Sequence, residues 1–434
     1  MNVTARTNEK SEQFNPSYPD SARALHGISL EKENFQKGPA DTILVDLGTT
    51  TIALILMEQT SGALRQSYVF SNPHRKYGAD VISRIQASMI HDRKDLKREL
   101  IDGITQACLR LCEKNKSDPS RITRCLIAGN TAMIHLLMGY DCRPLSSSPF
   151  QIQEASPQPF YYKNCLVQIV PWISAFLGGD ITAGLYACSL ERSPQTNLFI
   201  DLGTNGEMVL SHGGKFYAAA TAAGPTFEGQ GLSHGCPAID GAISHIKYHR
   251  LQPSLTTIRN KIPVGICGSG AISATARLLE QGYMNPQGIL SSSFPDQGIF
   301  LANRVDGTPI YFTAQDLRNV QMSVAAISAG IQTLLHTARI PAKKVDTVYL
   351  GGGFGFFLDL EDCQTLRMFT DISSDRIQVC GNTCLRGLYN ISQSESFELS
   401  PPVIRTINLA ESEYFKACFL SHMSYDKPDS SSNT

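Results

Sequence analysis

One short segment, Asp201–Glu207 (DLGTNGE), constrains the fold of this chain more than any other. It lies between two apolar runs, Leu198–Ile200 and Met208–Leu210. An apolar strand, a turn with acidic, glycine and hydroxyl residues, and a second apolar strand together predict a β-hairpin. A glycine beside a carboxylate lets backbone N–H groups approach an anion, and the following threonine and asparagine add side-chain donors. The segment therefore predicts a hairpin whose tip binds phosphate and metal.

The same pattern occurs earlier in the chain. Asp46–Thr51 (DLGTTT) lies between the apolar runs Ile43–Val45 and Ile52–Leu56, about 155 residues before the second copy. A single D-x-G-T segment is weak evidence for any function. Two copies, each between strands, indicate a duplicated pair of domains that face one nucleotide.

The chain length supports two domains. With 434 residues, the chain exceeds the size at which one hydrophobic core usually keeps growing. We predict α/β structure with a first subdomain over 41–190 and a second over 191–423 that contains insertions. The polar segment 1–40 has no sustained periodicity and is predicted to be a disordered arm, and 424–434 a disordered tail.

Charge and hydropathy exclude several classes of partner. The formal net charge is −1 and no basic stripe is present, so neither nucleic acid nor an anionic membrane surface is expected to bind. No apolar run is long enough to cross a bilayer, and no secretory signal is visible. The 12 cysteines lie mostly in apolar segments and form no C-x-x-C pair, which is typical of reduced thiols in a cytoplasmic protein.

Two further strands end in glycine and correspond between the halves. Residues 124–128 predict a buried strand followed by Gly129-Asn130-Thr131, and residues 345–350 a buried strand followed by three consecutive glycines. Such glycines let a flat ring or a ribose lie against the backbone. A helix that starts at Asp180 corresponds to one that starts near Thr383. Asp180 stands where an N-cap belongs, which is a sufficient structural role, but its place just upstream of the second hairpin also makes it a functional candidate.

Three loops have both a structural and a functional interpretation. Residues 72–80 either cap the following helix as a solvated loop or lie over the phosphates or a partner. Residues 222–231 are too long and glycine-rich for a simple connection, which favours backbone approach to a ligand. Residues 264–270 open a helix with free N–H groups and a serine cap, or form a structural glycine turn.

These motifs resemble the actin-like ATPase, sugar-kinase and chaperone superfamily, in which two ribonuclease-H-like domains surround a nucleotide cleft. Within it, the chain most resembles the ATPase (ASKHA) domain of the reductive activators of corrinoid proteins. Members of that family use ATP to drive one low-potential electron to an inactive cobalt(II) corrinoid, which restores the cobalt(I) methyl acceptor in methyl-transfer metabolism. The segments that carry the resemblance are DLGTTT, NPHRKYGADVISRI, AGNTAMIHLLMG, GGDITAG, DLGTNGE, AAGPTFEG, GICGSGAI, AAISAGIQTLL and YLGGGFG.

The resemblance implies a nucleotide site for ATP and Mg²⁺. Asp46 and Asp201 would hold Mg²⁺, mostly through its waters, and Asp180 would orient the attacking water, with Glu207 as a second candidate. The helices that begin at Asp180 and near Thr383 would act as a hinge. The remaining implied contacts to phosphate and adenosine are Gly48, Thr49, Thr50, Gly203, Thr204, Asn205, Gly206, Gly351, Gly352 and Gly353.

The resemblance is incomplete in one respect. Those activators carry the electron on an iron–sulfur cluster, whereas this sequence has no C-x₄-C-x₂-C run. We therefore expect no iron–sulfur cluster in this chain, a corrinoid protein as partner, and a separate low-potential electron donor. The small residues of the helix predicted over 316–338 allow core packing or a symmetric dimer. The resemblance favours a homodimer.

Two other functions fit the same fold, because one fold supports many chemistries. A small-molecule kinase would need an acceptor pocket with a general base. An ATP-gated binding or chaperone-like protein would bind ATP tightly without turnover.

Overall fold

The computed structural model describes residues 40–78, 80–153, 156–249, 252–355, 358–394 and 402–426. Most of the predicted arm and most of the predicted tail therefore lie outside the described residues. Within the predicted tail, however, Tyr425 is buried, and its backbone N–H donates to the Pro286 carbonyl at 2.6 Å. The apolar ring of Tyr425 packs into a hydrophobic core, so order extends beyond the predicted boundary at 424.

The chain forms two compact units, and each is described by itself. Unit 1 comprises the chain up to Pro194 together with Gly213–Phe216 and Cys380–Ile404. Unit 2 comprises Gln195–His212, Tyr217–Val379 and the chain from Arg405 onward.

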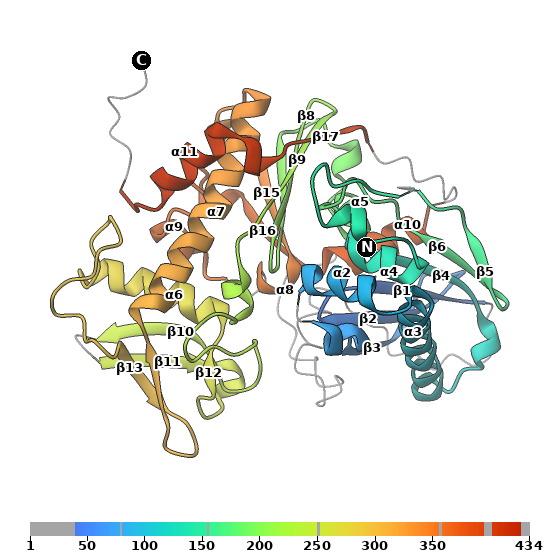
Figure 1. Ribbon diagram of the computed structural model, residues 1–434, viewed down its shortest axis with the longest axis horizontal. Coiled ribbons are helices and arrows are strands. Elements are labelled where there is room, and N and C mark those ends of the chain that lie inside the picture. The colour runs from blue at the N-terminus through green and yellow to red at the C-terminus, as the bar shows by residue number, and fades with distance from the viewer. Residues whose placement is uncertain are drawn as a thin grey trace. The chain divides into compact units, whose positions relative to one another are not determined.

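Unit 1 is built on a six-stranded sheet in the order β3-β2-β1-β4-β6-β5 (Figure 1). β1, β2 and β3 form an antiparallel meander, and β4 and β6 run parallel to β1. The strands are β1 Asp41–Leu47, β2 Thr51–Glu58, β3 Leu64–Ser71, β4 Ile122–Gly129, β5 Phe160–Tyr162 and β6 Cys165–Ile169. The helices are α2 Val81–Ile90, α3 Arg93–Asn115, α4 Thr131–Met138, α5 Gly179–Ala187 and α10 Thr383–Ser392.

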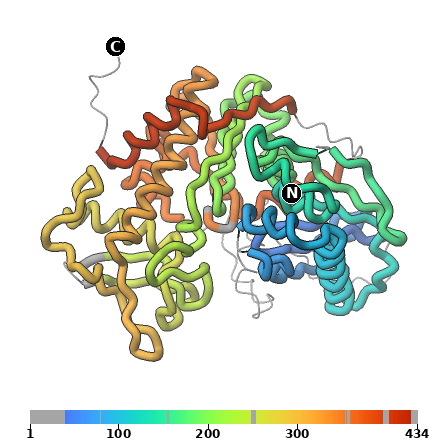
Figure 2. Tube along the Cα trace, in the orientation of Figure 1, coloured from blue at the N-terminus to red at the C-terminus, as the bar shows by residue number. Residues whose placement is uncertain are grey.

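Both faces of this sheet are covered, which explains why its central strands are apolar almost throughout. Ile43 and Val45 of β1 point into a core that α3 and α4 complete. Leu44 points into a second core that α5 and α10 complete. Figure 2 shows the late, red-coloured segment of α10 lying within the earlier blue and green chain of unit 1.

Unit 2 repeats this arrangement and adds to it. Its main sheet has the order β16-β15-β7-β8-β9-β17, and β11-β10-β12 and β13-β14 form smaller sheets. The strands are β7 Asn197–Leu202, β8 Gly206–His212, β9 Lys215–Thr221, β10 Ala242–His249, β11 Gln252–Thr257, β12 Gly265–Ile266, β13 Ile299–Asn303, β14 Pro309–Phe312, β15 Thr347–Gly351, β16 Ile377–Gly381 and β17 Ile404–Thr406. The helices are α6 Gly268–Glu280, α7 Ala314–Ala338, α8 Gly352–Gly355, α9 Leu360–Thr365 and α11 Glu413–His422.

The strand orders β3-β2-β1-β4-β6 and β9-β8-β7-β15-β16 are equivalent, which confirms the predicted duplicated α/β fold. The predicted second subdomain, 191–423, contains two segments that belong to unit 1, the short Gly213–Phe216 and the longer Cys380–Ile404. The longer segment belongs to unit 1 because Leu385 and Leu388 of α10 are buried in the core beneath the unit 1 sheet. None of the helices in the described residues is long and apolar enough to span a membrane.

Three helices show local features that the sequence did not reveal. In α2, the apolar residues Ile82 and Met89 are 66% and 47% exposed and so do not face the core. α6 begins at Gly268 after Cys267 without a side-chain cap, so the serine cap, one of the two interpretations of residues 264–270, is not observed. α11 was not predicted at all, because its 10 residues carry only a weak apolar face and depend on packing against α7.

Candidate nucleotide site

The first candidate hairpin lies at one edge of the unit 1 sheet. β1 ends directly after Asp46, and β1 runs parallel to β4 with Asp46 beside Ala128 and Leu47 beside Gly129. Because parallel strands end at the same edge, the Asp46–Thr51 tip and the turn after β4 lie next to each other.

Asparagine side chains from two other segments hold this tip. Asn72 Nδ2 donates to the Gly48 carbonyl at 2.8 Å, and the Asn72 backbone N–H donates to the Thr50 carbonyl at 3.0 Å. Asn130 Nδ2 donates to Thr49 Oγ1 at 2.8 Å. Asn130 also caps α4, since its Oδ1 accepts the N–H of Met133 at 3.0 Å. The predicted phosphate-binding residues Gly48, Thr49 and Thr50 are thus held in one geometry.

A third asparagine contacts the candidate Mg²⁺ ligand. Asn382 Nδ2 donates to Asp46 Oδ2 at 2.8 Å, and Asn382 Oδ1 accepts the N–H of Leu385 at 2.8 Å to cap α10. Burial raises the pKa of Asp46, and hydrogen bonds from Asn382 and Cys384 oppose that rise. A desolvated carboxylate of this kind favours a nearby cation. Sequence reasoning missed Asn382 as a site residue, although the Gly-Asn-Thr turn before its helix was the available signal.

Asp180 lies at the same edge, but not as the predicted N-cap. α5 begins at Gly179 with Gly178 as N-cap, so Asp180 is in the first turn, where its Oδ1 accepts the N–H of Ile181 at 2.9 Å. The backbone of Gly178 lies against Gly129 and Asn130. This contact brings Asp180 beside the Asn130 turn.

The second candidate hairpin meets the glycine-rich turn of unit 2. β7 and β15 are parallel with Asp201 beside Gly351, and a Cβ at Gly352 would lie 2.5 Å from Asp201 Oδ1. Gly352 also has a φ of +82°, which favours glycine. The Gly203 N–H donates to the Asn205 carbonyl at 2.9 Å and closes the tip, from which Gly206 leads into β8. The structure thus brings together Asp201 with Gly203, Thr204, Asn205 and Gly206, and with Gly351, Gly352 and Gly353.

Glu228 is a second residue that sequence reasoning missed. It ends the short 3₁₀ turn Pro225–Glu228, and its Oε1 lies 4.0 Å from the position that a Cβ at Gly203 would occupy. Its carboxylate therefore faces the tip of the second hairpin. The signal was a lone acidic residue within a loop already predicted to approach a ligand.

The loop over 72–80 has a structural role at both ends. Asn72 holds the first hairpin, as described above, and Asp80 caps α2 by accepting the Ser83 N–H at 2.8 Å. Between them, Lys76 Nζ and Tyr77 Oη both contact Glu99 Oε1, at 2.8 and 2.9 Å. The capping interpretation of this loop is confirmed for Asp80.

Two equivalent sheets, each with a D-x-G-T hairpin at the edge, define the actin-like ATPase (ASKHA) class of protein. Residues 195–433 match the family described as the C-terminal domain of RACo, the ASKHA domain, and residues 42–193 match the RACo middle region. The chain belongs to this family.

Three relatives illustrate the similarity. The corrinoid activation enzyme RamQ of Eubacterium limosum is 28% identical over 404 residues, which cover 85% of this chain and 67% of RamQ. A Methanosarcina barkeri [Co(II) methylated amine-specific corrinoid protein] reductase is 26% identical over 430 residues, covering 88% of this chain and 76% of the reductase. A solved reductive activator for corrinoid, iron–sulfur protein superposes with a TM-score of 0.77 at 29% identity, covering 89% of this chain and 66% of that one. The chain thus spans about two thirds of the length of the first and third of these proteins.

Proposed function

We propose that this protein is an ATPase that activates corrinoid proteins. ATP hydrolysis is coupled to the one-electron reduction of cobalt(II) to cobalt(I) in a bound corrinoid protein, and a separate iron–sulfur protein supplies the electron. The observation that carries the proposal is the pair of carboxylate hairpins, each joined to a glycine turn, in a chain whose relatives are named for corrinoid activation.

The donor set at both hairpins suits a hard cation with bound phosphates. Asp46 and Asp201 offer carboxylate oxygens, the ligands that Mg²⁺ prefers, mostly through its own waters. When bound, Mg²⁺ neutralises charge on the phosphates. Thr49, Thr50, Thr204 and Asn205 bind phosphate oxygens in this proposal, and Gly351, Gly352 and Gly353 approach the adenosine.

The protein's own residues contribute mainly position and charge. Asp180 orients the attacking water from the first turn of α5. Asn382 keeps the Asp46 carboxylate in place, since it donates to Asp46 Oδ2 at 2.8 Å. Hydrolysis drives reduction only if a nucleotide-dependent conformational change favours one state of the corrinoid partner.

The proposal also includes an external electron donor, a cytoplasmic location and a homodimer. The absence of a C-x₄-C-x₂-C run supports an external donor. Six of the 12 cysteines are buried and six are partly exposed, and thiols outside any disulfide support a reducing cytoplasmic setting. The homodimer stays a prediction, but Ala325, Ala329 and Gly330 of α7 are buried within unit 2, so a dimer would use another surface.

The test is the ATP hydrolysis rate of the purified protein, alone and with a corrinoid protein held as cobalt(II), with titanium(III) citrate as reductant. We expect the corrinoid partner to stimulate hydrolysis and cobalt(I) absorbance to appear only with ATP. Asp201→Asn and Asp46→Asn should each lower the hydrolysis rate by about 10²-fold or more, because each removes a charge placed for the transition state. Asp306→Asn, which changes an exposed carboxylate of the β13–β14 turn, is the matched control.

The other outcomes discriminate the alternatives. ATP-dependent phosphorylation of a metabolite would identify a kinase, and tight ATP binding without turnover would identify a gated binding protein. Hydrolysis that does not respond to the corrinoid protein would refute the proposed partner while leaving the nucleotide site intact.

A further inference from the structure

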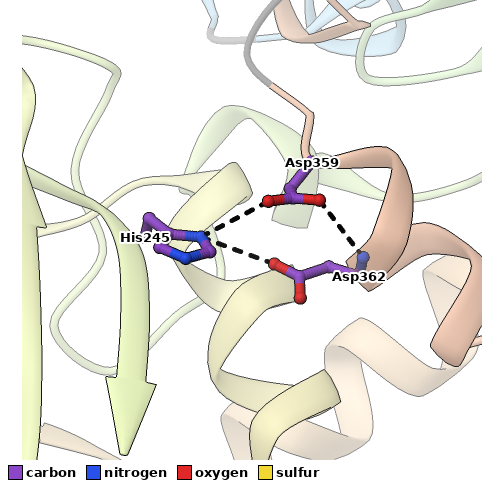
Figure 3. Close-up of side chains that lie close together, drawn as sticks. All are labelled: His245, Asp359 and Asp362. Atoms are coloured by element: carbon purple, nitrogen blue, oxygen red, sulfur yellow. Dashed lines mark hydrogen bonds and ion pairs between the residues drawn. The ribbon is translucent and has the colours of Figure 1, made fainter.

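A histidine and two aspartates converge in unit 2, outside the candidate nucleotide site. His245 comes from β10, Asp359 directly precedes α9, and Asp362 lies in the first turn of α9 (Figure 3). One ligand atom from each residue lies within 4.8 Å of the other two. His245 Nδ1 is 3.8 Å from Asp359 Oδ2 and 3.6 Å from Asp362 Oδ2.

One oxygen of this cluster is buried without a partner. The Asp362 side chain is 0% exposed, and its Oδ1 pairs with the guanidinium of Arg277. Its Oδ2 has no hydrogen-bond partner among the described residues, although it points toward His245. Leaving a buried carboxylate oxygen unpaired is destabilising, so the fold gains if a cation binds there.

The local charge also favours a divalent cation. Asp359, Asp362 and Glu280 are negative, and Arg277 contacts both Asp362 and Glu280, the latter at 2.7 Å. With His245 neutral, this group therefore carries a formal charge of about −2. A divalent cation neutralises it, whereas a proton on His245 leaves it negative.

The spacing distinguishes a metal from a shared proton. The two His245–carboxylate distances exceed the length of a hydrogen bond. Ligands about 2.1 Å from a tetrahedral ion are about 3.4 Å apart, which is close to these separations. The nearer neighbour of His245 Nδ1 is Ser273 Oγ at 3.1 Å, and that hydroxyl accepts the Ile246 N–H at 3.1 Å and donates to the Ile246 carbonyl at 3.2 Å.

We propose that His245, Asp359 and Asp362 bind a divalent transition-metal ion. The imidazole ligand argues against Mg²⁺ and Ca²⁺, which prefer all-oxygen sites, and suits Zn²⁺, while the two carboxylates also allow Mn²⁺ to bind. The His245 and Asp359 side chains are 24% and 41% exposed, so an ion can enter and keep water as a further ligand. The ion joins β10 to the segment that starts α9, the helix that follows α8 and the glycine turn of the nucleotide site.

The test uses the full-length protein after removal of metal with a chelator, titrated separately with Zn²⁺ and Mn²⁺. We expect one equivalent to bind and the melting temperature to rise, as for any ligand of the native state. Mn²⁺ followed by electron paramagnetic resonance guards against binding of Zn²⁺ to the free cysteines, because Mn²⁺ prefers oxygen ligands. Neither readout depends on ATP hydrolysis or on a corrinoid partner.

Two variants localise the site. His245→Ala should weaken binding by at least about 10-fold. Asp359→Asn should do the same while keeping a side chain that caps α9, so its fold is expected to stay intact. Asp240→Asn, at a carboxylate that is 51% exposed and pairs with Arg259, is the control and should bind normally. No saturable binding of either ion, or binding unchanged in both variants, would overturn the proposal.

Discussion

The two hairpin edges share a sequence pattern, yet different interactions hold them in place. In unit 1, the tip is held by side chains from distant segments, since Asn72, Asn130 and Asn382 donate to Gly48, Thr49 and Asp46. In unit 2, the Asp201 carboxylate lies against the bare backbone of Gly352. At one edge, polar side chains hold the tip in place, and at the other a glycine leaves the space that the Asp201 carboxylate occupies.

This difference predicts that substitutions at the two edges will impair the site to different extents. Loss of one asparagine leaves the unit 1 tip with two others, so the effect should be partial. A single added methyl group at Gly352 has no space and must displace Asp201, so the effect should be severe.

The largest effect is expected for Gly352→Ala. The new Cβ would lie 2.5 Å from Asp201 Oδ1, and a misplacement of about 1 Å at a catalytic group can cost about 10²-fold in rate. Steady-state ATP hydrolysis measures the loss. Gly282→Ala is the control, because its φ is +74° and nothing lies within 4 Å of the new Cβ. It should lose about 1–2 kcal/mol of stability and keep its activity.

Equal activity of Gly352→Ala and Gly282→Ala would show that the contact between Gly352 and Asp201 is not needed. The two edges would then not differ in the way proposed.

An intermediate effect is expected for Gly387→Ala in α10. A Cβ there would lie 1.9 Å from the Ala183 carbonyl of α5, so the two helices must separate at a cost of about 1–3 kcal/mol. Thermal unfolding should show a decrease of about 2–4 °C per kcal/mol. Gly103→Ala, also within a helix but 3.2 Å from the Phe70 ring, should stay within about 1 kcal/mol of the parent protein. A smaller loss at Gly387 than at Gly103 would contradict the packing of α10 on α5.

The smallest effect on stability is expected for Asn382→Ala, compared with Asn130→Ala. Both residues cap a helix, so each variant should lose about 1 kcal/mol in denaturant unfolding. Only Asn382 donates to Asp46, and loss of that bond raises the pKa of Asp46 further. We therefore expect the acid limb of the ATP hydrolysis profile to move to higher pH in Asn382→Ala alone.

The sign of this pH effect follows from the direction of the shift. The pKa of Asp46 is raised by burial, so protonated Asp46 is the form that the fold favours. Its contribution to stability is fully present below the ordinary pKa and is lost as pH rises through the raised value. ATP hydrolysis needs the charged form of Asp46, so its rate decreases as pH falls, whereas the contribution to stability decreases as pH rises. If the acid limbs of the two asparagine variants are identical, the hydrogen bond from Asn382 does not affect the protonation of Asp46 during hydrolysis.

The hairpins and the strands beside them were predictable from sequence. Apolar runs that flank DLGTTT and DLGTNGE leave few alternatives to a buried hairpin, and the two copies implied the duplication. The small residues of the helix predicted over 316–338 allow either core packing or a dimer, and the structure buries its apolar positions from Val320 to Leu334 in the unit 2 core. The exposure of Ile82 and Met89 on α2 could not be derived from the sequence, because a surface helix shows the same periodicity whether or not a partner covers each apolar residue.

Sequence alone thus determined which residues form the two hairpins and their glycine turns, since these depend on local backbone preference and on the period of burial. Only the tertiary structure decided that Asn382 caps α10 and holds Asp46, 336 residues away in the chain. The same is true of His245, Asp359 and Asp362, which no motif connects. Contacts of this kind form only when the packed cores bring two distant elements together. Neither the spacing of residues nor the composition predicts which distant elements will meet.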